Sequence, residues 1–208
     1  MEIKELISKE KIEKRIEELA GEISKDYEGK NIEFIVVLKG ATIFAVELAM
    51  KVKPNVRFEF IEISSYSGTE STGVLKVNKD LKADIEGKDV LIVEDIIDTG
   101  RTLSYLKEYL LSKNPNSLKI CTLVSKPSRR IVDVPIEYNG FEVEDKFIVG
   151  HGFDIDGDYR NLPYIGYIEY YAKWSLHKLT KITINDIIMW YNIINGGRIW
   201  GIKKESFY

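Results

Sequence analysis

The chain has 208 residues, of which 44% are hydrophobic and 30% charged, and its formal net charge is −3. This length suits one well-packed domain, and the composition is that of an ordinary globular protein rather than a disordered or fibrous one. The slightly acidic balance argues against a nucleic-acid partner, because proteins that neutralise phosphates usually carry a basic excess. No apolar stretch approaches the roughly 20 residues needed to cross a bilayer, and the charged N-terminus lacks the apolar core of a signal peptide. We therefore expect a cytoplasmic protein without a membrane partner.

The first part of the chain alternates between helical and strand patterns. Apolar residues recur three and four apart from Ile12 to Tyr27, which predicts a helix between a Ser8 cap and a Gly29 stop. Continuous apolar runs then predict strands at 32–38, 56–64, 88–96 and 117–125, and helical patterns lie at 41–52 and 102–114. This order predicts a mostly parallel sheet with helices on both faces. Ligands of such folds bind beyond the carboxyl ends of the strands.

The single cysteine, Cys121, lies in the apolar run KICTLVS. A lone cysteine forms no internal disulfide, and within a predicted strand it is more often a small buried hydrophobe than a nucleophile. We therefore expect Cys121 in the core.

Two segments have no regular pattern that fixes their role. The segment 63–80 is rich in Ser, Thr and Gly, and either a surface hairpin or a mobile lid accounts for it. The tail 169–208 differs in composition from the rest and contains all three tryptophans, Trp174, Trp190 and Trp200. It either packs on the domain, forms a surface for a partner or is poorly ordered.

The stretch VLIVEDIIDTGRTL (90–103) is the most informative for chemistry. A buried strand leads into Glu94 and Asp95, Asp98 follows, and a Thr-Gly-Arg-Thr turn opens a helix whose N–H groups and hydroxyls suit a phosphate monoester. Vicinal carboxylates can accept hydrogen bonds from two sugar hydroxyls or hold a metal through water, and Asp98 is placed to act as a base. A solvated turn with a helix cap accounts for any one of these acids, but not for all three beside this turn. The nucleoside-triphosphate loop and the dinucleotide fingerprint are both absent from the sequence.

At these residues the chain resembles the type I phosphoribosyltransferases, and EDIIDTG resembles in particular the hypoxanthine-guanine phosphoribosyltransferases. The resemblance implies an α/β fold with a central, mostly parallel sheet flanked by helices and a small hood formed by the N-terminal and C-terminal segments. It implies a phosphoribosyltransferase domain over 1–168 and an extension of unknown role over 169–208. The implied reaction transfers 5-phosphoribosyl from 5-phosphoribosyl 1-diphosphate to hypoxanthine or guanine, giving IMP or GMP and diphosphate. Mg²⁺ and a homodimer or homotetramer are implied as well, whereas the preference among hypoxanthine, guanine and xanthine is not.

The same resemblance implies binding roles around the sugar and the diphosphate. The phosphoribosyl group would be bound by Glu94, Asp95, Asp98, Thr99, Gly100, Arg101 and Thr102, with Asp98 as the catalytic base. The diphosphate would be bound by Leu38, Lys39, Gly40 and Arg160, with a non-proline cis peptide bond near Leu38–Lys39. Ser65 and Tyr66 would belong to the lid loop. The metal would be held by Glu94, Asp95 and Asp154.

For the purine, the resemblance implies a site made of Lys126, Phe147, Ile148 and Asp154. The Lys126 ammonium would donate to the exocyclic oxygen at carbon 6, which favours oxopurines over adenine. Phe147 would stack on the ring, and the backbone of Ile148 would read the edge of the base. Read alone, Lys126 is more typical of a surface lysine and Phe147 of a core residue.

Four positions depart from the family pattern: Ala41, Ser125, His151 and Ile155. Ala41 replaces a common glycine, Ser125 a common acid, and His151 and Ile155 replace aromatic residues. We interpret His151 as a structural histidine rather than a catalytic one. A ligand-sensing regulator that binds nucleic acid is the alternative function, and a partner surface built on the tail tryptophans is a third.

Overall fold

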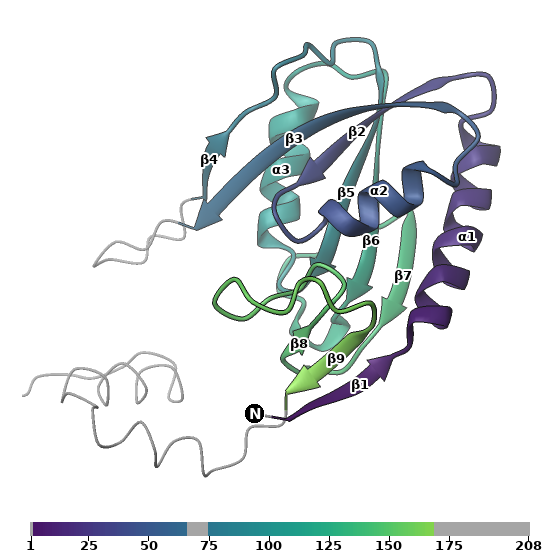
Figure 1. Ribbon diagram of the computed structural model, residues 1–208. Helices are drawn as coiled ribbons and strands as arrows, with labels where there is room; N and C mark the ends of the chain where they lie inside the picture. The colour runs from purple at the N-terminus through teal and green to yellow at the C-terminus, as the bar shows by residue number, and fades with distance from the viewer. Residues whose placement is uncertain (1, 66–74, 169–208) are drawn as a thin grey trace, which may run out of the picture. The chain divides into compact units, whose positions relative to one another are not determined.

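A six-stranded sheet with the order β4-β3-β2-β5-β6-β7 forms the centre of the computed structural model, which describes residues 2–65 and 75–168 (Figure 1). The strands are β2 (Asn31–Val37), β3 (Asn55–Ser65), β4 (Leu75–Lys79), β5 (Asp89–Ile97), β6 (Ser117–Ser125) and β7 (Tyr138–Glu142). All neighbouring strands are parallel except β3 and β4, which are antiparallel. The predicted mostly parallel sheet is therefore confirmed.

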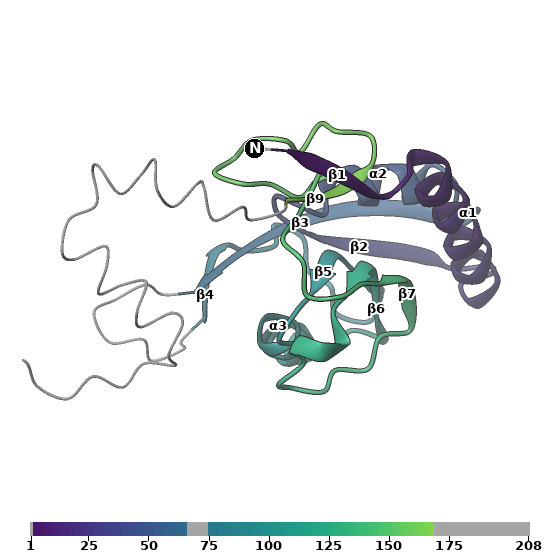
Figure 2. The ribbon, with the colours of Figure 1, turned by 90° about the horizontal axis from the view of Figure 1, so that it is seen from below.

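Helices cover both faces of this sheet, as Figure 2 shows. The helices α1 (Lys9–Asp26) and α2 (Thr42–Ala49) share one hydrophobic cluster with Phe34 and Val36 of β2. The helix α3 (Arg101–Leu111) shares a second cluster with Ile35 and Val37 of the same strand. Successive residues of β2 thus face opposite helical layers, which is why this strand is a continuous apolar run.

The α1 helix begins and ends close to the predicted residues. The Ser8 hydroxyl caps it by accepting a hydrogen bond from the Lys11 amide, and Gly29 lies just beyond its end with φ +74°. The apolar stripe of the helix is buried against the sheet. On the strand β6, Cys121 is fully buried as predicted, and burial raises the pKa of its thiol. Within residues 2–65 and 75–168, no helix is long and apolar enough to cross a membrane.

A second, three-stranded sheet is built from both ends of the phosphoribosyltransferase-like region. Its order is β1-β9-β8, with β1 at Ile3–Ile7, β8 at Ile148–Val149 and β9 at Ile165–Ile168, and its pairings are antiparallel. Ile7, Ile148 and Ile165 belong to the same core cluster as α1 and α2, which anchors the small sheet to the domain. This sheet is the hood expected from the N-terminal and C-terminal segments.

Candidate active site

Three backbone segments meet beyond the carboxyl ends of β2 and β5. A cis peptide bond joins Leu38 to Lys39 directly after β2, as predicted. The next residue, Gly40, lies so close to the end of β5 that a Cβ atom there would be 1.6 Å from Asp95 Oδ2. A Cβ on Gly152, in the connection between β8 and β9, would be 2.1 Å from the Gly40 carbonyl oxygen. Only glycine permits contacts this close, so the loop Leu38–Gly40, the acidic pair and the β8–β9 connection are held together.

Glu94 and Asp95 form a buried acidic pair at the end of β5. Glu94 is 9% exposed, and its Oε2 atom has no hydrogen-bond partner among the described residues. Burial raises the pKa of Glu94 well above its ordinary value, and repulsion from Asp95 adds to the shift. Burial also raises the pKa of Asp95, which the hydrogen bond from Ile96 N (2.8 Å) and the charge of Arg160 only partly offset. A buried carboxyl without a partner is energetically costly, so this pair is suited to sugar hydroxyls or a hard cation as ligands.

The turn after Asp98 lines a cavity of about 220 Å³ at the start of α3. Its walls are Glu94, Ile96, Ile97, Asp98, Thr99, Gly100, Thr102 and Leu103. Gly100 has φ +83°, and a Cβ there would be 2.2 Å from the Val132 carbonyl oxygen, so the turn requires glycine. The Thr99 carbonyl accepts hydrogen bonds from the amides of Ile131 and Val132, both at 3.0 Å. The backbone N–H groups at the start of a helix favour an anion such as phosphate.

Two arginines that the sequence interpretation left without a role hold this turn from outside. Arg129 Nε donates to Asp98 Oδ1 at 2.7 Å, and Arg130 Nε donates to the Asp98 carbonyl oxygen at 3.2 Å. Arg130 Nη2 also donates to Ser125 Oγ at 2.9 Å, so Ser125 is a neutral partner for this cation. The only signal in the sequence is a pair of adjacent basic residues three positions after Lys126.

The residues expected to bind the purine lie where β6 and β8 approach each other. Lys126 is only 8% exposed, and its ammonium donates to the Lys146 carbonyl oxygen at 2.6 Å. The adjacent Phe147 is 40% exposed, which leaves part of its ring open to a ligand, whereas Ile148 is buried in β8. A buried charged donor beside an exposed ring is suited to a flat heterocycle with a carbonyl oxygen.

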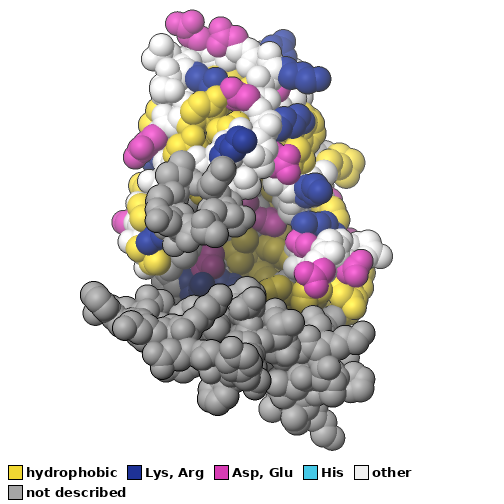
Figure 3. Space-filling view, turned by 90° about the vertical axis from the view of Figure 1, so that its left-hand side faces the viewer, with side chains coloured by type: hydrophobic (Ala, Val, Ile, Leu, Met, Phe, Trp, Pro, Cys, Tyr) yellow, Lys and Arg dark blue, Asp and Glu magenta, His cyan; other side chains and the backbone are white. Residues whose placement is uncertain are grey.

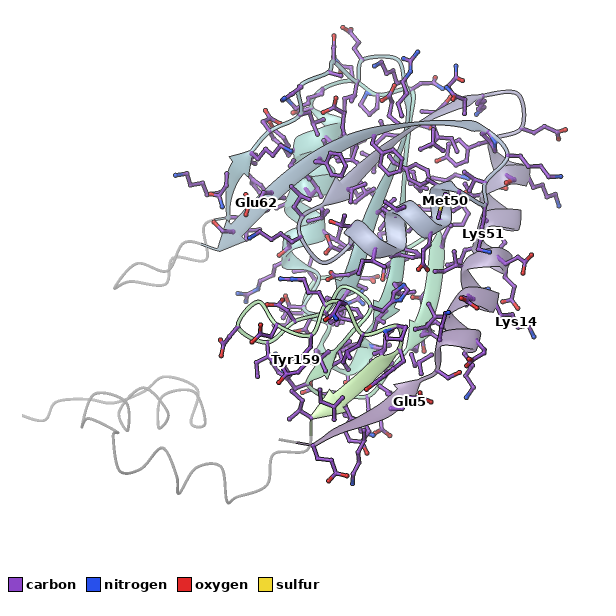
Figure 4. The ribbon with its side chains drawn as sticks, viewed as in Figure 1. Glu5, Lys14, Met50, Lys51, Glu62 and Tyr159 are labelled. Carbon is purple, nitrogen blue, oxygen red and sulfur yellow. The ribbon has the colours of Figure 1, made fainter. Side chains whose placement is uncertain are left out.

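Asp154 and Arg160 lie on the long connection between β8 and β9. Arg160 Nη2 is 2.6 Å from Asp154 Oδ1, and Arg160 Nη1 donates to the Gly152 carbonyl oxygen at 2.6 Å. Asp154 Oδ2 accepts a hydrogen bond from the Gly157 amide at 2.8 Å. The connection includes Tyr159, labelled in Figure 4, whose φ of +73° is unusual for an aromatic residue.

The three carboxylates expected to hold the metal are not gathered into one cluster. Across residues 2–65 and 75–168, no three His, Cys, Asp or Glu side chains lie together as a metal site. Glu94 and Asp95 are adjacent at the end of β5, whereas Asp154 is paired with Arg160. Magnesium commonly keeps several waters and is bound by one or two carboxylates together with substrate phosphates. A pair of adjacent carboxylates such as Glu94 and Asp95 is compatible with this kind of binding.

His151 is buried beside the helix α2 rather than facing the acidic pair. Its Nε2 atom lies 3.5 Å from Glu47 Oε2 and has no hydrogen-bond partner among the described residues. The distance would favour a charged pair, but burial opposes it, because burial lowers the pKa of His151 and raises the pKa of Glu47. Burial is the largest cause of the pKa shift of each group, and it works against a charged His151–Glu47 pair.

Five of the expected residues lie at the edge of the described residues or beyond it. Ser65 ends β3, while Tyr66 and the tail tryptophans Trp174, Trp190 and Trp200 lie outside the described residues. The choice between a surface hairpin and a lid for the segment around Tyr66 therefore stays a prediction.

Known proteins resemble this chain in sequence and fold. The family model described as phosphoribosyl transferase domain matches residues 2–156. A hypoxanthine-guanine-xanthine phosphoribosyltransferase of Tritrichomonas foetus is 48% identical over 165 residues, covering 79% of this chain and 90% of that protein. The bifunctional protein TilS/HprT of Listeria monocytogenes is 46% identical over 167 residues, but the chain spans only 26% of its length. A crystal structure of a hypoxanthine-guanine phosphoribosyltransferase from Bacillus anthracis has a TM-score of 0.77 and 48% identity, covering 81% of this chain and 100% of that one.

Proposed function

The chain belongs to the phosphoribosyltransferase family, and we propose that it transfers 5-phosphoribosyl from 5-phosphoribosyl 1-diphosphate to hypoxanthine or guanine. The products are IMP or GMP and diphosphate. One observation carries the proposal: the acidic pair Glu94–Asp95, the cavity at the start of α3 and the Gly40 loop converge at one edge of the sheet. Relatives at 48% and 46% identity that are named for this reaction support the choice of substrate.

The sugar diphosphate binds across the three segments that meet at Gly40. The turn Thr99–Thr102 takes the 5-phosphate through N–H groups and hydroxyls, and Glu94 and Asp95 take the ribose hydroxyls. The loop Leu38–Gly40 and Arg160 bind the diphosphate, for which a planar cation has the right shape. Holding the phosphate and the hydroxyls at separate points fixes the anomeric carbon toward the base, which lowers the entropic part of the barrier.

The purine binds between Phe147 and Lys126. The exposed part of the Phe147 ring stacks on the heterocycle, and the Lys126 ammonium donates to the oxygen at carbon 6. An amino group at this carbon would offer the ammonium no acceptor, so adenine is disfavoured. The preference among the oxopurines depends on the group at carbon 2, which the backbone near Ile148 reads.

In the reaction Asp98 accepts the proton of the purine nitrogen that does not attack the sugar. Arg160 neutralises negative charge that grows on the leaving diphosphate. The adjacent hard oxygen donors of Glu94 and Asp95, including the unpartnered Glu94 Oε2, fit Mg²⁺, whereas Asp154 would have to release Arg160 to take part. When bound, this ion would supply further charge neutralisation at the diphosphate.

The distribution of charge supports a small-molecule substrate over a nucleic-acid partner. On the face seen in Figure 3, the Lys and Arg side chains of the described residues are interspersed with Asp and Glu. A nucleic-acid surface would require a basic patch. A cytoplasmic location, a homodimer or homotetramer, and a separate role for 169–208 belong to the same proposal.

The test is turnover by the purified chain with 5-phosphoribosyl 1-diphosphate, Mg²⁺ and, separately, hypoxanthine, guanine, xanthine and adenine. We expect nucleotide formation with oxopurines and none with adenine. An identically purified preparation from host cells that lack this chain measures the background from host enzymes. Absence of turnover with all four bases would contradict the proposal, and a gel shift with RNA and DNA would then test the regulator.

A further inference from the structure

Four charged side chains lie in a row from the proposed base to the lysine proposed to recognise the purine. Arg129 donates through Nε to Asp98 Oδ1 at 2.7 Å and through Nη1 to Asp145 Oδ2 at 3.1 Å. Asp145 Oδ1 in turn lies 3.6 Å from the ammonium of Lys126. We call Asp98, Arg129, Asp145 and Lys126 the ionic row. It connects the proposed base to the lysine proposed to recognise the purine, through side chains that are distant in sequence.

The row occupies one oxygen of the Asp98 carboxylate and leaves the other open. Among residues 2–65 and 75–168, no hydrogen bond or ion pair engages Asp98 Oδ2, whereas Oδ1 is held by Arg129. The guanidinium of Arg129 is a rigid planar fork, and its two engaged nitrogens bind two different carboxylates. Fixing one oxygen in this way restricts rotation of the carboxylate about its last bond.

We propose that Arg129 is a positioning residue for deprotonation of the purine. It holds one oxygen of Asp98 so that the other faces the base, and Asp145 keeps both Arg129 and Lys126 in place. This inference rests on the proposed function, because it assigns a role within the same reaction.

The net charge of the row rises by one during the proton transfer, because Asp98 alone changes its charge. The N–H bond of the purine breaks, an O–H bond forms on Asp98, and the electron pair stays on the ring, whose other nitrogen bonds to the anomeric carbon as diphosphate leaves. Asp98 becomes neutral at that point, and its attraction for Arg129 weakens. Asp145 remains ionised beside Arg129, so the guanidinium keeps a charged partner throughout.

Exposure of the row limits its contribution to stability but not to geometry. The side chains of Arg129, Asp98 and Asp145 are 45%, 39% and 51% exposed, and ion pairs this exposed add little to folding. Their effect should therefore appear in turnover rather than in the melting temperature. This distinction separates a positioning role from a structural one.

The test compares Arg129→Gln and Arg129→Lys with the wild-type chain and with Arg57→Gln. Arg57 is a control, because its exposed side chain pairs with the buried Glu33 at the amino ends of the strands, away from the carboxyl ends that form the site. We expect Arg129→Gln to lower kcat by roughly tenfold, with little change in the KM for 5-phosphoribosyl 1-diphosphate. Arg129→Lys should recover little, since an ammonium lacks the fork that reaches both carboxylates. Arg57→Gln should match the wild type.

The outcomes separate the inference from the function on which it rests. An inactive wild-type chain overturns the proposed function. An active wild type with an Arg129→Gln variant within about twofold of its kcat overturns the inference alone. A rise only in the KM for the sugar diphosphate also overturns it, because Arg129 would then act on that substrate.

A second variant keeps the test decisive if Arg129→Gln fails to fold. Asp145→Asn removes the charge that supports both Arg129 and Lys126. We expect a lower kcat together with a higher KM for hypoxanthine. Wild-type values of both parameters in this variant would overturn the inference.

Discussion

Replacing Gly40 with alanine should displace Asp95 and disable the enzyme without unfolding it. The new Cβ would lie 1.6 Å from Asp95 Oδ2, whereas non-bonded heavy atoms need about 3 Å or more. Either the carboxylate or the loop must therefore move by more than about 1 Å. A misplacement of this size in a positioning group costs about 100-fold in rate. We expect kcat/KM for 5-phosphoribosyl 1-diphosphate to fall by about that factor.

The assay measures initial rates with varied sugar diphosphate, alongside thermal unfolding. Gly21→Ala is the matched control, because Gly21 lies on α1 with nothing within 4 Å of its Cβ position. That change should leave kcat/KM unaltered and stabilise the fold by about 1 kcal/mol, since alanine is the better helix former. If a folded Gly40→Ala variant kept kcat/KM within about threefold of the wild type, the contact with Asp95 would be irrelevant to catalysis. The argument from close packing would then be wrong.

Three further changes test individual residues. Asp98→Asn removes the base and should lower kcat by about 100-fold or more. The affinity for the sugar diphosphate, measured by calorimetry, should stay near the wild-type value. Near-normal turnover would exclude Asp98 as the base. Lys126→Gln removes the buried ammonium, so it should lower the ratio of kcat/KM for hypoxanthine to kcat/KM for adenine. An unchanged ratio would refute the role of Lys126. Burial lowers the pKa of His151 below its ordinary 6.5, so the folded state binds the proton less tightly than the unfolded state does. The contribution of His151 to the free energy of unfolding is therefore complete above pH 6.5 and lost as the pH falls through the lowered pKa. Urea unfolding at pH 7.5 and pH 5 should show a smaller loss of stability between the two pH values in His151→Asn than in the wild type. Equal losses in the two proteins would count against a buried neutral histidine.

The centre of the fold could be predicted because its physical signals are local. The strand β2 is buried along six of its seven residues, so it is a continuous apolar run, and α1 has one apolar stripe. The strands β4, β7 and β8 lack such signals. The strand β7 (YNGFE) has only one fully buried residue, and β8 has two residues in all. Short strands at an edge of a sheet are fixed by tertiary pairing rather than by their own pattern.

The candidate site also has one part that the sequence predicts and one part that it does not. The acids and the phosphate turn are contiguous in EDIIDTGRT, so the sequence alone predicts that they lie together. The contacts of Arg129 with Asp98 and Asp145 span 31 and 16 residues, and no periodicity connects such positions. Likewise, His151 Nε2 lies 3.5 Å from Glu47 Oε2 on a different element. These contacts arise only when β5, β6 and the β8–β9 connection have been brought together by the core.

The site therefore has a rigid part and an adaptable part. Gly40, Gly100 and Gly152 approach their neighbours through backbone or a buried carboxylate, and such contacts leave no room for a side chain to rearrange. The proposed purine site is less enclosed, because Phe147 is 40% exposed and the nearby Arg129 side chain is 45% exposed. We propose the rigid part for binding phosphate, ribose and diphosphate, and the adaptable part for binding the base. Differences in base preference should consequently arise from substitutions around Phe147 and the ionic row, while substitutions at the three glycines should lower turnover for all bases alike.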